Sequence, residues 1–143
     1  QQEKYDQAID YYKEAAHYFH ENDTYFDLAW CYYKSGNILQ CRQTLTQAKS
    51  VQNRYPIFEQ LIEWLQITLD AKYSVAALNC LLKIENNYGE EMDQSIKQLI
   101  RTQIAQHYEY HRQYDQACEY YRLANQRNVT EYDEDTPALS SDI

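Results

Sequence analysis

The stretch YDQAIDYYKEAAHYF, residues 5–19, returns in altered form as YDQACEYYRLANQR, residues 114–127. The tetrad YDQA is identical in the two copies, and apolar and aromatic side chains recur in both at spacings of three and four residues. That spacing places them on one face of an α-helix. The chain therefore contains the same amphipathic helix twice, which indicates an array of repeated helical units.

The composition favours helices throughout. Only two Gly and two Pro occur in 143 residues, whereas Ala, Gln, Glu, Leu and Lys, which favour helices, are plentiful. A hydrophobic content of 44% and a charged content of 24% are ordinary for a globular domain of this length. The sequence therefore predicts an all-α fold.

Periodicity and turn residues predict about seven helices, over residues 3–21, 24–34, 38–52, 56–70, 74–87, 91–111 and 114–127. Gly36 follows the second helix, because glycine readily adopts the left-handed conformation that ends helices. Pro56 opens the fourth, since a first helical turn does not need its missing N–H. The break between His111 and Tyr114 contains no Gly or Pro, so it is inferred from the repeat alone.

Two of the predicted hairpins share a packing pattern. Its residues have the same relative offsets in both: Leu28, Ala29, Tyr32, Gly36, Cys41, Leu45 and Ala48 in the first, and Ile104, Ala105, Tyr108, Arg112, Ala117, Tyr121 and Ala124 in the second. A small residue midway along each helix lets two backbones approach closely, and a large residue four positions later fills the groove beside the crossing. We therefore expect Ala29 to cross Cys41, and Ala105 to cross Ala117.

This pattern resembles the tetratricopeptide repeat, a helix–turn–helix unit of about 34 residues. The segment YYKSGNILQCRQTLTQAK, residues 32–49, is similar to the central motif of that family, with Gly36 in the turn and Cys41 where Ala is usual. The resemblance implies a right-handed superhelix of antiparallel helix hairpins over residues 1–128. Residues 4–19 match the second helix of a repeat, so further repeats or another domain are expected to precede residue 1 in a parent protein.

The repeat length also predicts a lengthened middle unit. Ala8 and Cys41 are 33 residues apart, whereas Cys41 and Ala117 are 76 apart, which is room for two repeats of about 38 residues. Either Ala76 or Ala77 is expected at the crossing of this unit. Its first helix has Trp64 or Leu65 where the small residue belongs.

Charge and hydropathy exclude two classes of partner. The net charge is −9, of which the stretch 129–143 contributes −5, and no basic stripe of the kind that binds nucleic acid is present. No apolar run is long enough to span a membrane.

Residues 129–143 are polar and acidic, which predicts a disordered tail. No signal-peptide pattern is visible, so a cytoplasmic location is expected. The oligomeric state is left open.

The resemblance implies a concave groove, lined by the first helix of each pair, that binds a peptide or a partner helix. The candidate binding residues are those of the first helices that the packing pattern does not use: Phe26, Trp30, Tyr33, Lys34, Thr102, Gln106, Glu109 and Tyr110. Aromatic rings bury area at low entropic cost, and polar side chains pair with a peptide backbone. An equal alternative is that Phe26 and Trp30 pack against the helix of residues 3–21. A carboxylate clamp of the chaperone-adaptor type is not expected, because Phe26, Trp30, Thr102 and Gln106 occupy its places.

The sequence contains little that supports catalysis or metal binding. His107 and His111 lie four residues apart, but no Glu follows the first of them as a zinc-protease motif requires. The four cysteines, Cys31, Cys41, Cys80 and Cys118, form no CxxC pair and are interpreted as small buried side chains at helix contacts. We therefore expect no enzyme, no cofactor and no metal.

The predicted function is that of a scaffold or adaptor module that binds proteins or peptides. A second hypothesis rests on AWCYYKSGN, residues 29–37, followed by LTQAK, residues 45–49. These segments resemble the repeat domains of Gram-positive peptide-pheromone receptors. That resemblance implies a peptide-sensing domain of a bacterial transcriptional or signalling regulator.

Overall fold

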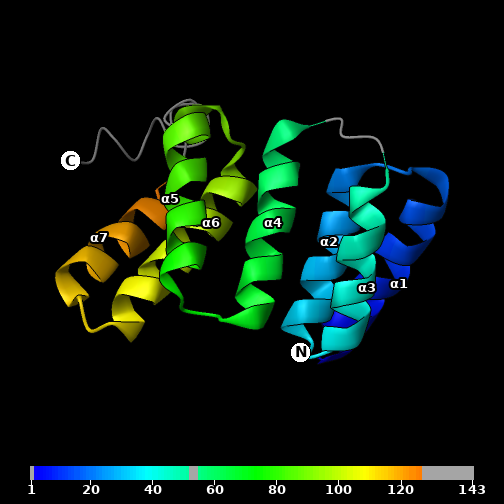
Figure 1. Ribbon diagram of the computed structural model, residues 1–143, viewed down its shortest axis with the longest axis horizontal. Helices are drawn as coiled ribbons and strands as arrows, with labels where there is room; N and C mark the ends of the chain where they lie inside the picture. Colours follow the sequence, from blue (N-terminus) through cyan, green and yellow to red (C-terminus); the bar gives the residue numbers. More distant parts are fainter. Residues whose placement is uncertain (1, 52–54, 127–143) are drawn as a thin grey trace, which may run out of the picture. The chain divides into compact units, whose positions relative to one another are not determined.

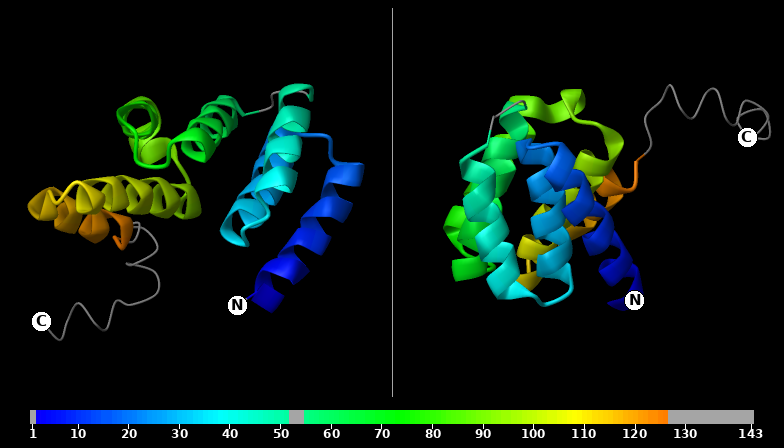
Figure 2. Two further views of the ribbon diagram at one scale, coloured as in Figure 1. Left: turned by 60° about the horizontal axis from the view of Figure 1, so that its bottom comes forward. Right: turned by 90° about the vertical axis from the view of Figure 1, so that its right-hand side faces the viewer.

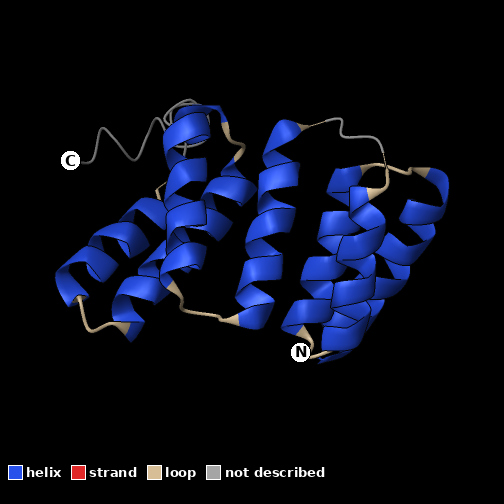
Figure 3. Ribbon diagram, viewed as in Figure 1, coloured by secondary structure: helices blue, strands red, loops and turns tan. Residues whose placement is uncertain are grey.

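The computed structural model describes residues 2–51 and 55–126, and its regular elements there are all helical (Figure 3). In order they are α1 (Gln2–Tyr18), α2 (Asn22–Lys34), α3 (Ile38–Lys49), α4 (Pro56–Asp70), α5 (Val75–Tyr88), the 3₁₀ helix η1 (Gly89–Glu91), α6 (Gln94–Tyr110) and α7 (Tyr114–Ala124) (Figure 1). The chain divides into two compact units, residues 1–80 and residues from 81 onward, and α5 crosses the boundary.

The predicted helices are confirmed, with differences at their ends. α6 begins at Gln94 and not near residue 91, because the Asp93 carboxylate caps it by accepting the Ile96 backbone N–H at 3.0 Å. α2 begins at Asn22, two residues earlier than expected, and α1 ends at Tyr18. The acidic tail of residues 129–143 lies outside the described residues.

In the first unit α2 is central, and it packs against α1, α3 and α4. Ala29 of α2 and Cys41 of α3 are both fully buried, as is Leu45 four residues after Cys41. This is the arrangement that the packing pattern predicted, because two small residues let the backbones of α2 and α3 approach. A neighbouring side of α2 meets α1 through Leu28, which clusters with Ile9.

In the second unit α6 and α7 lie side by side, as Figure 2 shows. Ala105 and Ala117 are buried at their interface, so the second small-residue crossing is also confirmed. The Arg101 guanidinium of α6 holds Glu85 of α5 through Nε at 2.8 Å and Nη2 at 3.1 Å. That ion pair fastens the C-terminal part of α5 to α6 within the second unit.

The two hairpins turn in the same way. Gly36 has φ +86° and Arg112 has φ +62°, so both residues are in the left-handed region. The residue after each donates its N–H five positions back, Asn37 to the Tyr32 carbonyl and Gln113 to the Tyr108 carbonyl, each at 2.8 Å. This is a helix-ending Schellman turn. The turn without glycine therefore forms at Arg112, at the offset that the repeat assigns to Gly36.

The structure also places the small residue of the lengthened middle repeat, which is formed by α4 and α5, and the cysteines. Ala77 is fully buried and Ala76 is exposed, so Ala77 is the small residue of α5; Trp64 and Leu65 of α4 are both buried. The cysteine interpretation is confirmed for Cys31 and Cys41, which are buried. It is wrong for Cys118 of α7, which is exposed.

Candidate functional site

An aromatic cluster joins α2 to α4 in the first unit. The ring centroids of Phe26 and Trp30 are 6.4 Å apart and the rings are stacked. Phe26 also contacts Phe58 at 5.9 Å, and Trp30 contacts Trp64 at 5.8 Å. Phe58 and Trp64 both belong to α4. The rings of α2 are therefore covered, at least in part, by the first helix of the next pair.

This cluster corrects the expected exposed position of Phe26. Phe26 is only 1% exposed and lies in the core, so it cannot form an open floor for a ligand. The alternative prediction, that Phe26 and Trp30 pack against α1, is wrong as well, because their ring partners outside α2 belong to α4. The face of α2 that meets α1 contains Leu28 and Cys31 instead.

Beside this core lies a surface that we call the aromatic–lysine patch, formed by Trp30, Tyr33, Lys34, Lys72 and Tyr73. Trp30 stacks on Tyr33 at 5.5 Å, and the Lys34 Nζ lies 5.5 Å from the centroid of the Trp30 ring. The Lys72 Nζ lies 5.3 Å from the centroid of the Tyr73 ring. Both lysines are exposed and the three rings are half-buried.

The patch is locally positive in a unit that is acidic overall. Residues 1–80 contain seven Lys and Arg against ten Asp and Glu, a net charge of −3. Within the described residues neither Lys34 nor Lys72 forms an ion pair with a carboxylate. Burial raises the pKa of Tyr33, and the ammonium group of Lys72, which hydrogen-bonds that side chain, partly offsets the rise. Two cations next to half-buried rings suit a ligand with an apolar side chain and a carboxylate.

The second set of predicted binding residues lies on α6, in the second unit. Thr102 and Gln106 are half-buried, whereas Glu109 and Tyr110 are exposed. The Glu109 carboxylate accepts a hydrogen bond from the Tyr121 hydroxyl at 2.7 Å, so it holds α7 to α6. These four residues lie along one helix, α6.

Two hollows between α3 and α4 form a furrow that the sequence did not predict. Their volumes are about 450 Å³ and 330 Å³, and Gln66 lines both. The furrow is lined by Asn22, Arg42, Leu45, Thr46, Ala48, Lys49, Val51, Glu59, Ile62, Glu63, Gln66, Leu69 and Asp70. An ion pair of 3.1 Å between Arg42 and Asp70 spans one of its ends. The sequence analysis did not identify the furrow, or Lys72 and Tyr73 as binding residues. Their positions depend on how α4 packs against α2 and α3, which no local sequence pattern specifies.

The hairpin of α2 and α3 has a small-residue crossing and a left-handed turn. Residues 1–65 match the family model of the tetratricopeptide repeat. The matched part spans α1, α2, α3 and most of α4. α6 and α7 lie outside the matched residues, and they share with α2 and α3 the small-residue crossing and the left-handed turn. No curated protein and no solved structure matches the chain.

Tetratricopeptide repeats are generally non-catalytic modules of protein–protein interaction. In the described part of the chain no group of three or more His, Cys, Asp or Glu side chains could hold a metal ion. His107 is buried, and its burial, helped by His111, lowers its pKa to about 4. No helix among the described residues has the length and apolar character to cross a bilayer.

Proposed function

We propose that this protein is an interaction module whose first unit binds a peptide or helical segment of a partner protein at the aromatic–lysine patch. An apolar side chain of the partner packs on Trp30 and Tyr33, and a neighbouring carboxylate pairs with Lys34 or Lys72. The observation that carries the proposal is the placement of both lysines against aromatic rings, without a carboxylate partner among the described residues.

The energetics favour a short acidic segment with one apolar anchor. A buried aromatic contact at the centre of an interface commonly contributes 2 kcal/mol or more. Exposed ion pairs contribute roughly 0.2–1 kcal/mol each and mainly set charge preference and association rate. The patch therefore selects for acidic partners while the rings supply most of the affinity.

The test uses linear peptides selected from a random library on the immobilised protein and then titrated by calorimetry. We expect the selected peptides to be rich in Asp or Glu beside an apolar residue. The double variant Lys34→Glu/Lys72→Glu should weaken their binding about tenfold or more, equivalent to about 1.4 kcal/mol. The matched control is Lys83→Glu, an exposed lysine on α5 outside the patch, and it should leave binding unchanged.

Trp30→Ala should weaken the same peptides roughly thirtyfold. Trp30 also contacts Trp64 of the core. The Trp30→Ala variant must therefore have the circular dichroism spectrum and thermal melt of the parent protein before a loss of affinity is assigned to the binding surface. Loss of binding in Lys49→Glu with none in the Lys34→Glu/Lys72→Glu variant would overturn the proposal. The furrow between α3 and α4, which Lys49 lines, would then be the site.

A peptide-sensing domain of a bacterial regulator is a second candidate function. The patch favours it in one respect, because its two ring–lysine pairs suit a few consecutive residues of an extended peptide. A sensor would bind free peptides of about five to ten residues as tightly as longer ones, whereas an adaptor would gain affinity with a longer segment. Truncation of the selected peptides separates the two.

A further inference from the structure

The furrow between α3 and α4 has one basic wall and one acidic wall. α3 contains Arg42 and Lys49 and no acidic residue. α4 contains Glu59, Glu63 and Asp70 and no Lys or Arg. A ligand that lies in the furrow therefore meets cations on one side and carboxylates on the other.

The direction of the two helices decides which charges oppose each other. The larger hollow is lined by late residues of α3 and early residues of α4, and the smaller hollow by earlier residues of α3 and later ones of α4, so the helices run antiparallel. Arg42 and Lys49 are seven residues apart, as are Glu63 and Asp70, which is about two turns along one face of each helix. Arg42 is paired with Asp70 at 3.1 Å. Lys49 is therefore opposite Glu63, and both line the larger hollow.

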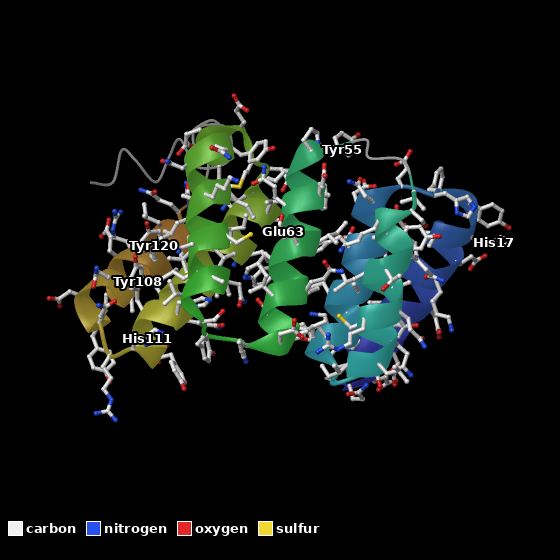
Figure 4. All side chains as sticks on the ribbon, in the orientation of Figure 1. His17, Tyr55, Glu63, Tyr108, His111 and Tyr120 are labelled. Atoms are coloured by element: carbon white, nitrogen blue, oxygen red, sulfur yellow. The ribbon has the colours of Figure 1, made fainter. Side chains whose placement is uncertain are left out.

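The second pair of opposite charges is open, whereas the first is closed. Among the described residues, neither Lys49 nor Glu63, which is labelled on α4 in Figure 4, forms an ion pair. Both side chains are exposed beside a hollow of about 450 Å³. Its lining includes the apolar side chains of Ala48 and Ile62, which are 3% and 4% exposed. This end of the furrow therefore presents a cation and a carboxylate on either side of an apolar floor.

We propose that this open end, formed by Ala48, Lys49, Ile62, Glu63 and Gln66, binds a small zwitterion with an apolar centre, of the size of a di- or tripeptide. The carboxylate of the ligand pairs with the Lys49 ammonium group, and its ammonium group pairs with the Glu63 carboxylate. Its apolar side chain packs on Ala48 and Ile62. The half-buried Gln66 carboxamide can both donate to and accept from a peptide group.

The separation of the two walls sets the length of the ligand. An extended di- or tripeptide separates its charged termini by about 7–10 Å, which is similar to the roughly 8–10 Å between the axes of packed helices. A single amino acid has both charges on one carbon atom, so it reaches only one wall. A longer extended chain would place one terminus beyond the open end, where the closed pair of Arg42 and Asp70 leaves no free charge for it.

The probe is the tripeptide Ala-Leu-Ala with free termini, titrated into the full isotope-labelled chain and followed by nuclear magnetic resonance. Chemical-shift changes should saturate and map to α3 and α4, with the side-chain amide of Gln66 among them. Lys49→Gln and Glu63→Gln should each weaken binding about two- to fivefold, the effect of one exposed ion pair. The matched controls are Lys4→Gln and Glu14→Gln, two exposed positions on α1, and they should leave binding unchanged.

Blocked tripeptides assign each charge to its wall. The N-acetylated form has no ammonium group, so Glu63→Gln should not change its affinity, whereas Lys49→Gln should still weaken it. The C-amidated form has no carboxylate and should show the reverse. Gly-Gly-Gly with free termini should bind more weakly than Ala-Leu-Ala, because it has no apolar side chain for the floor.

Several outcomes would contradict the proposal. The free tripeptide might show no saturable shifts, or the doubly blocked tripeptide could bind as well as the free one, which would mean that the termini pair with neither wall. Loss of binding in the Lys34→Glu/Lys72→Glu variant, with none in Lys49→Gln, would assign the tripeptide to the aromatic–lysine patch instead. We expect that double variant to bind Ala-Leu-Ala normally, so this proposal and the proposed function stand or fall separately.

Discussion

At the residue scale, two very different residues, Gly36 and Arg112, adopt the same left-handed backbone conformation. Gly36 and Arg112 both have positive φ, and both close a hairpin between a first and a second helix. A left-handed conformation costs a residue with a Cβ roughly 1–2 kcal/mol, whereas glycine adopts it freely. The second hairpin therefore stores strain at Arg112 that the first hairpin avoids.

This difference predicts opposite effects for a pair of substitutions. Gly36→Ala should destabilise the protein by about 1 kcal/mol, and Arg112→Gly should stabilise it by about 0.5–1 kcal/mol. A Cβ at Gly36 would meet no atom within 4 Å, so the cost there is that of the backbone alone. Urea denaturation followed by circular dichroism measures both changes. A stabilising Gly36→Ala would show that the turn does not keep its left-handed residue in solution.

At the element scale, each hairpin depends on one crossing between two small residues. Ala105 and Ala117 are both buried where α6 and α7 meet, and Ala29 and Cys41 are buried in the equivalent place between α2 and α3. Such crossings have no spare volume, because protein interiors are packed at close to the density of organic crystals.

A larger side chain at this crossing should separate the two helices. Ala117→Leu should lower the free energy of unfolding by about 1–3 kcal/mol through overpacking. Gln116→Leu, which adds an apolar side chain at the exposed neighbouring position, is the matched control and should have little effect. A change in Ala117→Leu below about 0.5 kcal/mol, the size usual for surface substitutions, would mean that Ala117 does not lie at the crossing.

At the scale of the whole molecule, we expect the two units to differ in their response to acid. His107 is 2% exposed within the second unit, and burial, with a smaller effect of His111, lowers its pKa to about 4. An unfolded histidine titrates near pH 6.5, so between about pH 6.5 and 4 the unfolded state binds more protons than the folded state. The stability of the second unit therefore falls as the pH is lowered through this window. α2 and α3 of the first unit contain no histidine.

Hydrogen exchange, corrected for the intrinsic rate at each pH, should accordingly report local acid opening. Protection in α6 and α7 should fall between pH 6.5 and 4, with a loss of up to about 3 kcal/mol from His107. Protection in α2 and α3 should change much less. His107→Gln should remove most of the pH dependence, whereas His111→Gln at the exposed end of α6 should retain it. Equal acid sensitivity of both units would contradict the assignment to His107.

The sequence by itself determined the helices, the two small-residue crossings and the turn at Gly36. These features depend on residues close together along the chain, where a period of three to four residues or a single glycine has one strongly preferred conformation. The Arg112 turn was placed by the repeat, although its left-handed backbone has no local signal. The right-handed superhelical stacking of the hairpins stays a prediction.

Only the tertiary structure decided which side of α2 is covered. Phe26 and Trp30 have the spacing of an open aromatic floor, yet α4 packs its own Phe58 and Trp64 against them. Which of several apolar faces a helix buries depends on the angle and distance at which a later helix crosses it. Those quantities are set by side chains roughly thirty residues further along the chain, and no local pattern specifies them. The same crossing brings the turn residues Lys72 and Tyr73 beside Tyr33 and so creates the aromatic–lysine patch.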